Sequence, residues 1–231
     1  MGFSADAISP NALIKRMDER WRKIQQFQAE LSQAVEIKGA SESSRYIGSL
    51  YIQRGSWLRL DFQLMSQERS EDIIGSESIE GFEPFQPDDI YLANPEFMIH
   101  YSPREKKVTR QYLWQSGLPP MLQALAGTGH FETEEFKRNY DKKRVEEEDI
   151  QGQPTYLMNF VPKGEQAASL PTYQFWIHRE TLLPVRLRVI SREEEIDVEF
   201  KMCDVEKPLP ENIFDIRFPE DVQIIDRTQE L

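Results

Sequence analysis

The residues that most often carry catalysis or bind metals are few and scattered in this sequence. The three histidines, His100, His130 and His178, stand alone, without the short spacings of a metal-ligand set. The acidic runs 146–149 and 193–195 are consecutive residues. Consecutive residues of a strand point to opposite faces, so neither run converges readily on one cation. We interpret both runs as solvated turns and expect no catalytic residue, no metal and no cofactor.

The single cysteine, Cys203, has no partner histidine that the sequence would suggest, so a nucleophilic role is not expected. The glycine-rich dinucleotide motif, the P-loop and the nucleophile elbow are all absent from the sequence. One enzymatic hypothesis stays open, a pair of carboxylates acting on a lipid or a glycan. That hypothesis requires two acids in one cleft with raised pKa values.

The charge balance excludes some classes of partner. The 231 residues contain 28 Lys and Arg against 40 Asp and Glu, a net charge of −12, and 39% are hydrophobic. A polyanion of this kind repels nucleic acid and anionic membrane surfaces, so neither is expected as a partner. No stretch approaches the ~20 apolar residues that a membrane-spanning helix requires.

The elements that must position any functional residue begin with a predicted helix. Ser9 is a suitable N-cap, and Pro10 is tolerated in the first turn. Apolar residues then follow at spacings of three and four, which predicts one long helix over residues 10–36. The stripe consists of Leu13, Met17, Trp21, Ile24, Phe27, Leu31 and Val35.

After Gly39 the apolar period changes to two. Such alternation is typical of antiparallel strands with one buried and one wet face, and the short spacing between the runs predicts a meander without intervening helices. Examples are 48–53, 58–62, 97–101, 173–177, 185–189 and 196–202. We therefore expect an α+β fold, a curved antiparallel sheet covered by helices, in a single domain over residues 1–231.

Two stretches interrupt this alternation of apolar and polar residues. Residues 66–89 are acidic and contain two glycines and two prolines, which indicates a long insertion loop. Residues 118–127 are very apolar and are bounded by Pro120 and Gly127, which predicts a short helix. Such a helix must lie against or inside the concave face of the sheet.

Several strings, taken in order, resemble the periplasmic outer-membrane lipoprotein carriers of the LolA type. The resemblance is collinear over about residues 10–226, and it depends on the order of the strings. They are 20–31 (RWRKIQQFQAEL), 48–54 (GSLYIQR), 58–62 (LRLDF), 97–103 (FMIHYSP), 160–163 (FVPK) and 214–222 (FDIRFPEDV).

The resemblance implies a strongly curved half-barrel of about eleven antiparallel strands, covered by the long N-terminal helix and a short lid helix at 118–127. It also implies a periplasmic, monomeric, non-enzymatic carrier that shields the acyl chains of lipoproteins, or of another lipid, and passes them between membranes. Its partners would then be an acylated lipoprotein, the inner-membrane release machinery and an outer-membrane acceptor.

The resemblance also implies roles for individual residues. Arg54 matches an arginine that hydrogen-bonds the lid, so we expect it near the mouth as a latch. The expected lipid-binding residues are apolar and lie on the helices or the concave face. They are Trp21, Phe27, Leu50, Ile52, Leu58, Leu60, Phe62, Phe97, Ile99, Tyr101, Leu118, Met121, Leu122, Leu125, Phe175 and Leu187.

A second hypothesis gives the same fold another function. The chain would be a protein-binding module, such as an envelope sensor or an assembly subunit, that transfers no lipid. Its docking arm would be the 66–89 insertion, where Phe82, Phe85 and Ile90 stand among acidic residues. A closed core without lipid would favour this hypothesis over the carrier.

Overall fold

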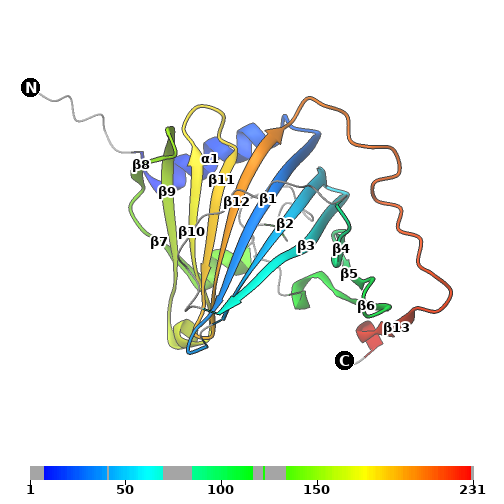
Figure 1. Ribbon diagram of the computed structural model, residues 1–231. Helices are drawn as coiled ribbons and strands as arrows, with labels where there is room; N and C mark the ends of the chain where they lie inside the picture. The colour runs from blue at the N-terminus through cyan, green and yellow to red at the C-terminus, as the bar shows by residue number, and fades with distance from the viewer. Residues whose placement is uncertain (1–7, 41, 70–84, 117–121, 123–133, 230–231) are drawn as a thin grey trace, which may run out of the picture.

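The computed structural model describes residues 8–40, 42–69, 85–116, 122 and 134–229 (Figure 1). Their strands form one open, curved sheet of thirteen strands, in the order β13-β6-β5-β4-β3-β2-β1-β12-β11-β10-β9-β7, and β8 also pairs with β9. Every strand pair is antiparallel except β13 with β6. The predicted α+β half-barrel is therefore confirmed, with thirteen strands in place of about eleven.

The strands are mostly long in the centre of the sheet and short at its edges. Their bounds are β1 (Gln26–Ile37), β2 (Glu42–Gln53), β3 (Trp57–Arg69), β4 (Asp89–Ala93), β5 (Phe97–Ser102), β6 (Lys107–Tyr112), β7 (Tyr140–Lys142), β8 (Glu146–Ile150), β9 (Gln153–Pro162), β10 (Thr172–His178), β11 (Pro184–Ile190), β12 (Glu194–Asp204) and β13 (Gln223–Asp226). The helical elements are α1 (Pro10–Trp21), α3 (Glu134–Asn139), η1 (Leu113–Gln115), η2 (Glu165–Ala168) and η3 (Arg227–Gln229).

The predicted long helix over 10–36 is wrong in its second half. Helix α1 starts as expected, with the Ser9 hydroxyl accepting from the Ala12 amide at 3.3 Å, but it ends at Trp21, and β1 follows from Gln26. The spacing of four that joins Phe27, Leu31 and Val35 belongs equally to one face of a helix and to one face of a strand. These residues form a strand because they pair with β2 on one side and with β12 on the other.

The predicted loop over 66–89 is shorter than expected at both ends. Strand β3 continues to Arg69, and β4 begins at Asp89. Residues 70–84, including Phe82, lie outside the described residues. Before β4 the chain is tied to β3, because the Leu64 amide donates to the Asp88 carboxylate at 2.8 Å and the Asp88 amide donates to the Phe62 carbonyl at 2.8 Å.

The concave face of the sheet holds the main apolar core. Helix α1 lies behind the sheet at one end of the strands (Figure 1), and its Leu13, Met17 and Trp21 are at most 2% exposed. They belong to the same buried cluster as Phe27 of β1, Ile52 of β2 and Leu58 of β3, which face one another across the strands. The helix therefore covers one end of the concave face.

The convex face is mostly polar apart from two apolar clusters, of which one consists of Leu157, Trp176 and Val185 with Ile150 packed against them. Arg186 forms a bidentate salt bridge with Asp197, and Arg188 pairs with Glu195. Over β4–β6, however, the buried Ile90, Tyr101 and Val108 pack against Ile216, Phe218 and Val222 of the C-terminal segment. This segment is held by Arg59, which donates to the Ile213 carbonyl at 2.6 Å. The Nε of Arg59 also donates to both carboxylate oxygens of the buried Asp61.

Candidate functional site

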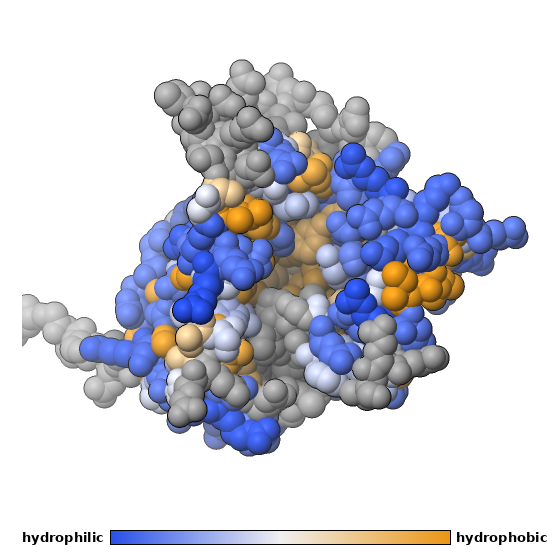
Figure 2. Space-filling model, turned by 90° about the horizontal axis from the view of Figure 1, so that it is seen from below, coloured by the Kyte–Doolittle hydropathy of each residue, from blue (hydrophilic) through white to orange (hydrophobic). Residues whose placement is uncertain are grey.

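The end of the concave face that α1 does not cover contains an apolar cavity. Its volume is about 410 Å³, within the range of ~300–1,000 Å³ typical of ligand pockets. Figure 2 shows the hollow from below, with apolar residues in its depth and polar residues around it. The described lining is Leu31, Gln33, Val35, Tyr46, Leu50, Leu60, Phe62, Asp89, Tyr91, Ser116, Leu122, Pro171, Tyr173, Leu187, Val189, Ser191, Glu194, Ile196, Val198 and Phe200.

The floor of the cavity is a row of aliphatic residues on neighbouring strands. Val35 of β1 faces Ile196 of β12, which in turn faces Val189 of β11. All three are only half-buried, although residues opposite each other in a sheet ordinarily bury one another. The apolar face therefore continues past the packed core into space that an apolar ligand can fill.

One wall of the cavity is aromatic. The Phe62 ring packs edge-on against Tyr46, at 6.4 Å between centroids, and against Tyr91, at 6.3 Å. Tyr91 stacks in parallel on the His100 ring at 4.4 Å. Burial, reinforced by the nearby charge of Asp89, raises the pKa of Tyr91 to about 12. The Tyr91 hydroxyl is therefore a neutral hydrogen-bonding group at physiological pH.

The opposite wall is closed by a second aromatic group. Phe136 of α3 packs on Tyr140 at 4.5 Å and on Phe160 at 5.0 Å, and Tyr140 lies 5.4 Å from Tyr173 of the cavity lining. Burial raises the pKa of both Tyr140 and Tyr173. The short helix α3 thus fixes this side of the cavity through ring packing.

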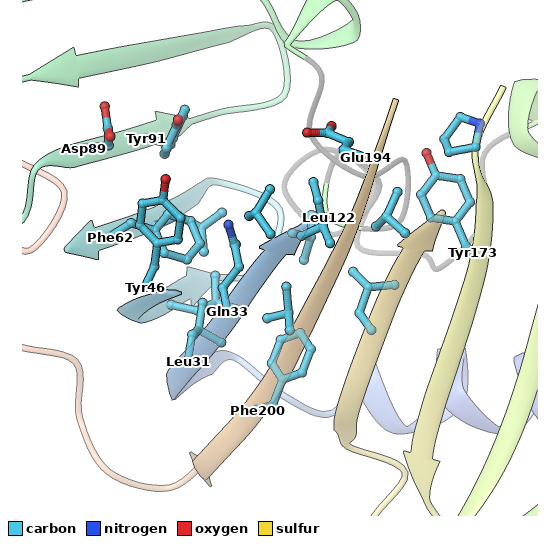
Figure 3. Close-up of a pocket in the computed structure, with 18 of the residues that line it drawn as sticks. Leu31, Gln33, Tyr46, Phe62, Asp89, Tyr91, Leu122, Tyr173, Glu194 and Phe200 are labelled. Atoms are coloured by element: carbon cyan, nitrogen blue, oxygen red, sulfur yellow. The ribbon is translucent and has the colours of Figure 1, made fainter. Parts of the chain in front are cut away.

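Two carboxylates, Asp89 and Glu194, lie among the lining residues, on different strands (Figure 3). An Asp89 oxygen lies 2.6 Å from Nε2 of His100, so the imidazole holds this carboxylate in place. The alternation of β5 puts His100 on the face opposite Phe97, Ile99 and Tyr101. That face is the concave one, and His100 is half-buried there.

Five of the predicted lipid-binding residues line the cavity, namely Leu50, Leu60, Phe62, Leu122 and Leu187. Five others lie in the packed core, at most 2% exposed and away from the cavity, namely Trp21, Phe27, Ile52, Leu58 and Phe175. These five do not line the cavity.

Phe97, Ile99 and Tyr101 lie on the convex face. In β5 it is Met98 that faces Ala93 and joins the concave core, whereas Tyr101 packs against Phe218 at 5.2 Å and Ile99 joins the same cluster. Phe97 stacks on Tyr112. The alternation in this strand was predicted correctly, but Ile99 and Tyr101 pack against the C-terminal segment and do not line the cavity.

The predicted lid helix at 118–127 falls mostly outside the described residues, as do Leu118, Met121 and Leu125. Leu122 is described; it is half-buried, packs on the core and projects into the cavity (Figure 3).

Arg54 is found away from the cavity. It follows β2 at the α1 end, whereas Tyr46 at the cavity is eight residues back, ~27 Å at the rise of a strand. Its guanidinium donates to the Arg22 carbonyl at 2.5 Å, and its amide donates to the Gln25 carbonyl at 3.0 Å. Among the described residues, Arg54 thus fastens the turn between α1 and β1.

Several lining residues were missed as site residues. Leu31 and Val35 were assigned to a helix, and Tyr46, Tyr91 and Asp89 were not considered. Val189, Ile196, Val198 and Phe200 were recognised as strand residues of one face but not as cavity residues. The signal for these four was available, because the period of two places them on the same face as Leu187.

The remaining chemical groups do not gather into a reactive site in the described part of the chain. Burial raises the pKa of Cys203 to about 12, and its thiol donates to the Pro184 carbonyl at 3.6 Å. Within the described ranges, no three His, Cys, Asp or Glu side chains are placed to hold a metal ion. No described helix has the length and apolar character that crossing a membrane requires.

No protein-family model matches the sequence, and no curated protein is significantly similar to it. Solved structures are similar to the chain. An uncharacterized conserved protein from Thermus thermophilus is 13% identical, with 92% of this chain and 98% of that chain covered and a TM-score of 0.54. The structure of MucB is 14% identical, with coverage of 96% and 66% and a TM-score of 0.50.

A LolA superfamily protein from Nitrosomonas europaea is also similar, at 11% identity, coverage of 91% and 99%, and a TM-score of 0.42. At such identities the likeness concerns the fold alone. The chain shares its fold with the Thermus thermophilus protein and with MucB.

Proposed function

We propose that this chain is a periplasmic carrier that shields an acyl chain of a lipoprotein, or of another lipid, in its concave cavity and passes it between membranes. The observation that carries the proposal is the half-buried row Val35, Ile196 and Val189, an apolar floor that the described chain leaves open. The sequence resemblance to LolA-type carriers supports the same function.

The size of the cavity sets what it can hold. If a methylene group occupies about as much space as a water molecule, ~30 Å³, a cavity of about 410 Å³ accommodates roughly a dozen methylenes. Each buried methylene contributes about 0.8 kcal/mol, or ~10 kcal/mol in total before the costs of binding. The cavity thus fits one acyl chain of this length and binds it in a releasable way.

The test places a charge in the cavity and the same charge outside it. Ile196→Glu puts a carboxylate on the cavity floor, whereas Ile47→Glu puts one on the convex face, because Ile47 lies opposite Ser32 and Gln63. Both isoleucines are half-buried, so the two variants are matched in residue type, charge and exposure. Circular dichroism establishes that both are folded.

Binding is measured by native mass spectrometry with a diacylated lipopeptide and with dodecanol, a neutral twelve-carbon chain. Wild type and Ile47→Glu should take up both ligands, and Ile196→Glu should lose uptake, because a buried unpaired carboxylate is costly. Absence of uptake by the wild-type chain, or equal uptake by the two folded variants, contradicts the proposal.

A second candidate function, a protein-binding module of the same fold, is favoured by one surface feature. Phe97, Tyr112 and Trp114 form a continuous stack of rings outside the cavity, and Trp114 is 63% exposed. Exposed aromatic groups of this kind are enriched in protein interfaces. If this function holds, Trp114→Ala should abolish capture of a protein partner without changing uptake of dodecanol.

A further inference from the structure

The charges around the cavity are of one sign. Asp89 and Glu194 are among its lining residues, and no lysine or arginine is among the lining residues that the structure describes. In the sequence, the ranges 1–7, 41, 70–84, 117–121, 123–133 and 230–231 contain no lysine or arginine at all. Among the described lining residues, a ligand head group therefore meets carboxylates, hydroxyls and an amide, and no lysine or arginine.

Of the described cations near this end of the sheet, Arg186 and Arg188 lie on the convex face, whereas Lys38 contacts the backbone of Ser191, a lining residue. The Lys38 ammonium donates to the Ser191 carbonyl at 2.6 Å, and Lys38 itself is exposed at the end of β1. Arg188 pairs with Glu195 and Asp197 on the convex face, where Arg186 also lies. Because Glu195 and Glu194 are neighbours on a strand, they point to opposite faces, and the arginines partner only the convex one.

Glu194 and Asp89 differ in how they are held. Asp89 is fixed by His100 at 2.6 Å, and this pair is neutral if the imidazole is protonated. Glu194 is the first residue of β12, where its backbone is bonded to Ser191. Its carboxylate leaves the lining negative even when the Asp89–His100 pair is neutral.

Building on the proposed function, we infer that the cavity selects its cargo by the charge of the polar end. It accepts acyl or alkyl chains that end in an amine or in an uncharged group, such as an ester or an alcohol. It binds chains that end in a carboxylate or a phosphate more weakly. The apolar floor supplies affinity for every chain of suitable length, and Glu194 with Asp89 supplies the discrimination.

The test compares three probes with the same twelve-carbon chain below their micellar concentrations, namely dodecylamine, dodecanol and laurate. Dissociation constants are measured by calorimetry at constant pH and ionic strength. The wild-type chain should bind laurate about fivefold more weakly than dodecanol, the upper end of the effect of one partly exposed charge pair. Dodecylamine should bind at least as tightly as dodecanol.

Charge reversal identifies the residue responsible. Glu194→Lys should bring laurate to the affinity of dodecanol or above it and should weaken dodecylamine. Glu193→Lys is the matched control, since Glu193 directly precedes Glu194, is exposed and is not a lining residue, and its substitution changes the net charge equally. In Glu193→Lys, the order of the three dissociation constants should be the same as in the wild type.

The outcomes separate this inference from the proposed function. Equal binding of all three probes overturns the charge selection and leaves the carrier function intact. An equal effect of Glu193→Lys and Glu194→Lys also overturns it, because the net charge of −12 would then explain the preference through its long-range field. Absence of binding by every probe, including dodecanol, overturns the proposed function itself.

Discussion

The two ends of the concave face are built by the same strands but differ in how deeply their side chains are buried. At the α1 end, Phe27, Ile52 and Leu58 are at most 2% exposed. At the other end of the same strands, Val35 of β1 and Tyr46 of β2 are half-buried around the cavity. We call these the closed end and the open end. Alternation of apolar residues is the same at both, so the difference comes from what lies on the sheet.

The comparison shows that the presence of one short helix makes the difference between a packed core and a cavity. Helix α1 contributes Leu13, Met17 and Trp21 to the closed end, where they complete the burial of the strand residues. The open end has an apolar floor, but its described cover is limited to Leu122 and the aromatic walls. Stability should therefore depend on the closed end, and binding on the open end.

The largest expected effect is on the free energy of unfolding at the closed end. Leu58 is fully buried, so Leu58→Ala should lower that free energy by about 2–5 kcal/mol. Ile196→Ala at the open end should lower it by only about 1 kcal/mol, since the side chain is already partly in water. Urea denaturation measures both. Equal losses would mean that the two ends are one continuous core.

The next effect is on cysteine reactivity, which reports access to each end. Burial raises the pKa of the Cys203 thiol from 9.0 to about 12, so alkylation at pH 8 should be at least ~100-fold slower in the native protein than in urea. In a Cys203→Ser background, Val189→Cys at the open end should react quickly, and added dodecanol should slow that reaction. Rapid alkylation of native Cys203 would contradict this description of the closed end.

A smaller effect is expected where the two ends meet. A Cβ atom at Gly48 would lie 2.5 Å from the Asp61 carbonyl oxygen and 2.8 Å from the Phe62 ring. Gly48→Ala should therefore cost about 1–3 kcal/mol of stability and should displace Phe62 from the cavity wall, which weakens dodecanol binding. Ser49→Ala, one position along on the other face, is the control for thermal melting and binding. Unchanged melting of Gly48→Ala would contradict this prediction, because both the Asp61 carbonyl and the Phe62 ring would then have to shift without cost.

Much of the sheet was predictable because its apolar period is local. The runs 48–53, 58–62, 173–177, 185–189 and 196–202 all fall in strands, and Ser9 with Pro10 marked the start of α1 correctly. The end of α1 was not predictable in this way. Neither glycine nor proline marks the turn after Trp21, and a spacing of four fits both helix and strand.

The site was only partly predictable because segments distant in the sequence determine what covers each face of the sheet. Ile99 and Tyr101 were expected at the ligand, but Ile216, Phe218 and Val222, more than a hundred positions later, pack against them. Likewise, Leu58 and Leu60 have the same pattern in sequence, but α1 encloses the first while the second lines the cavity. Periodicity identifies a face, and only tertiary packing decides what covers it.

An open sheet has two free edges, and the way these edges are built bears on self-association. One edge ends in the four-residue β13, joined parallel to β6; at the other, β7 has three residues and β8 begins with four carboxylates, Glu146 to Asp149. Short and charged edges discourage pairing between copies of a chain. We therefore expect the protein to remain monomeric at high concentration, even though its sheet never closes on itself.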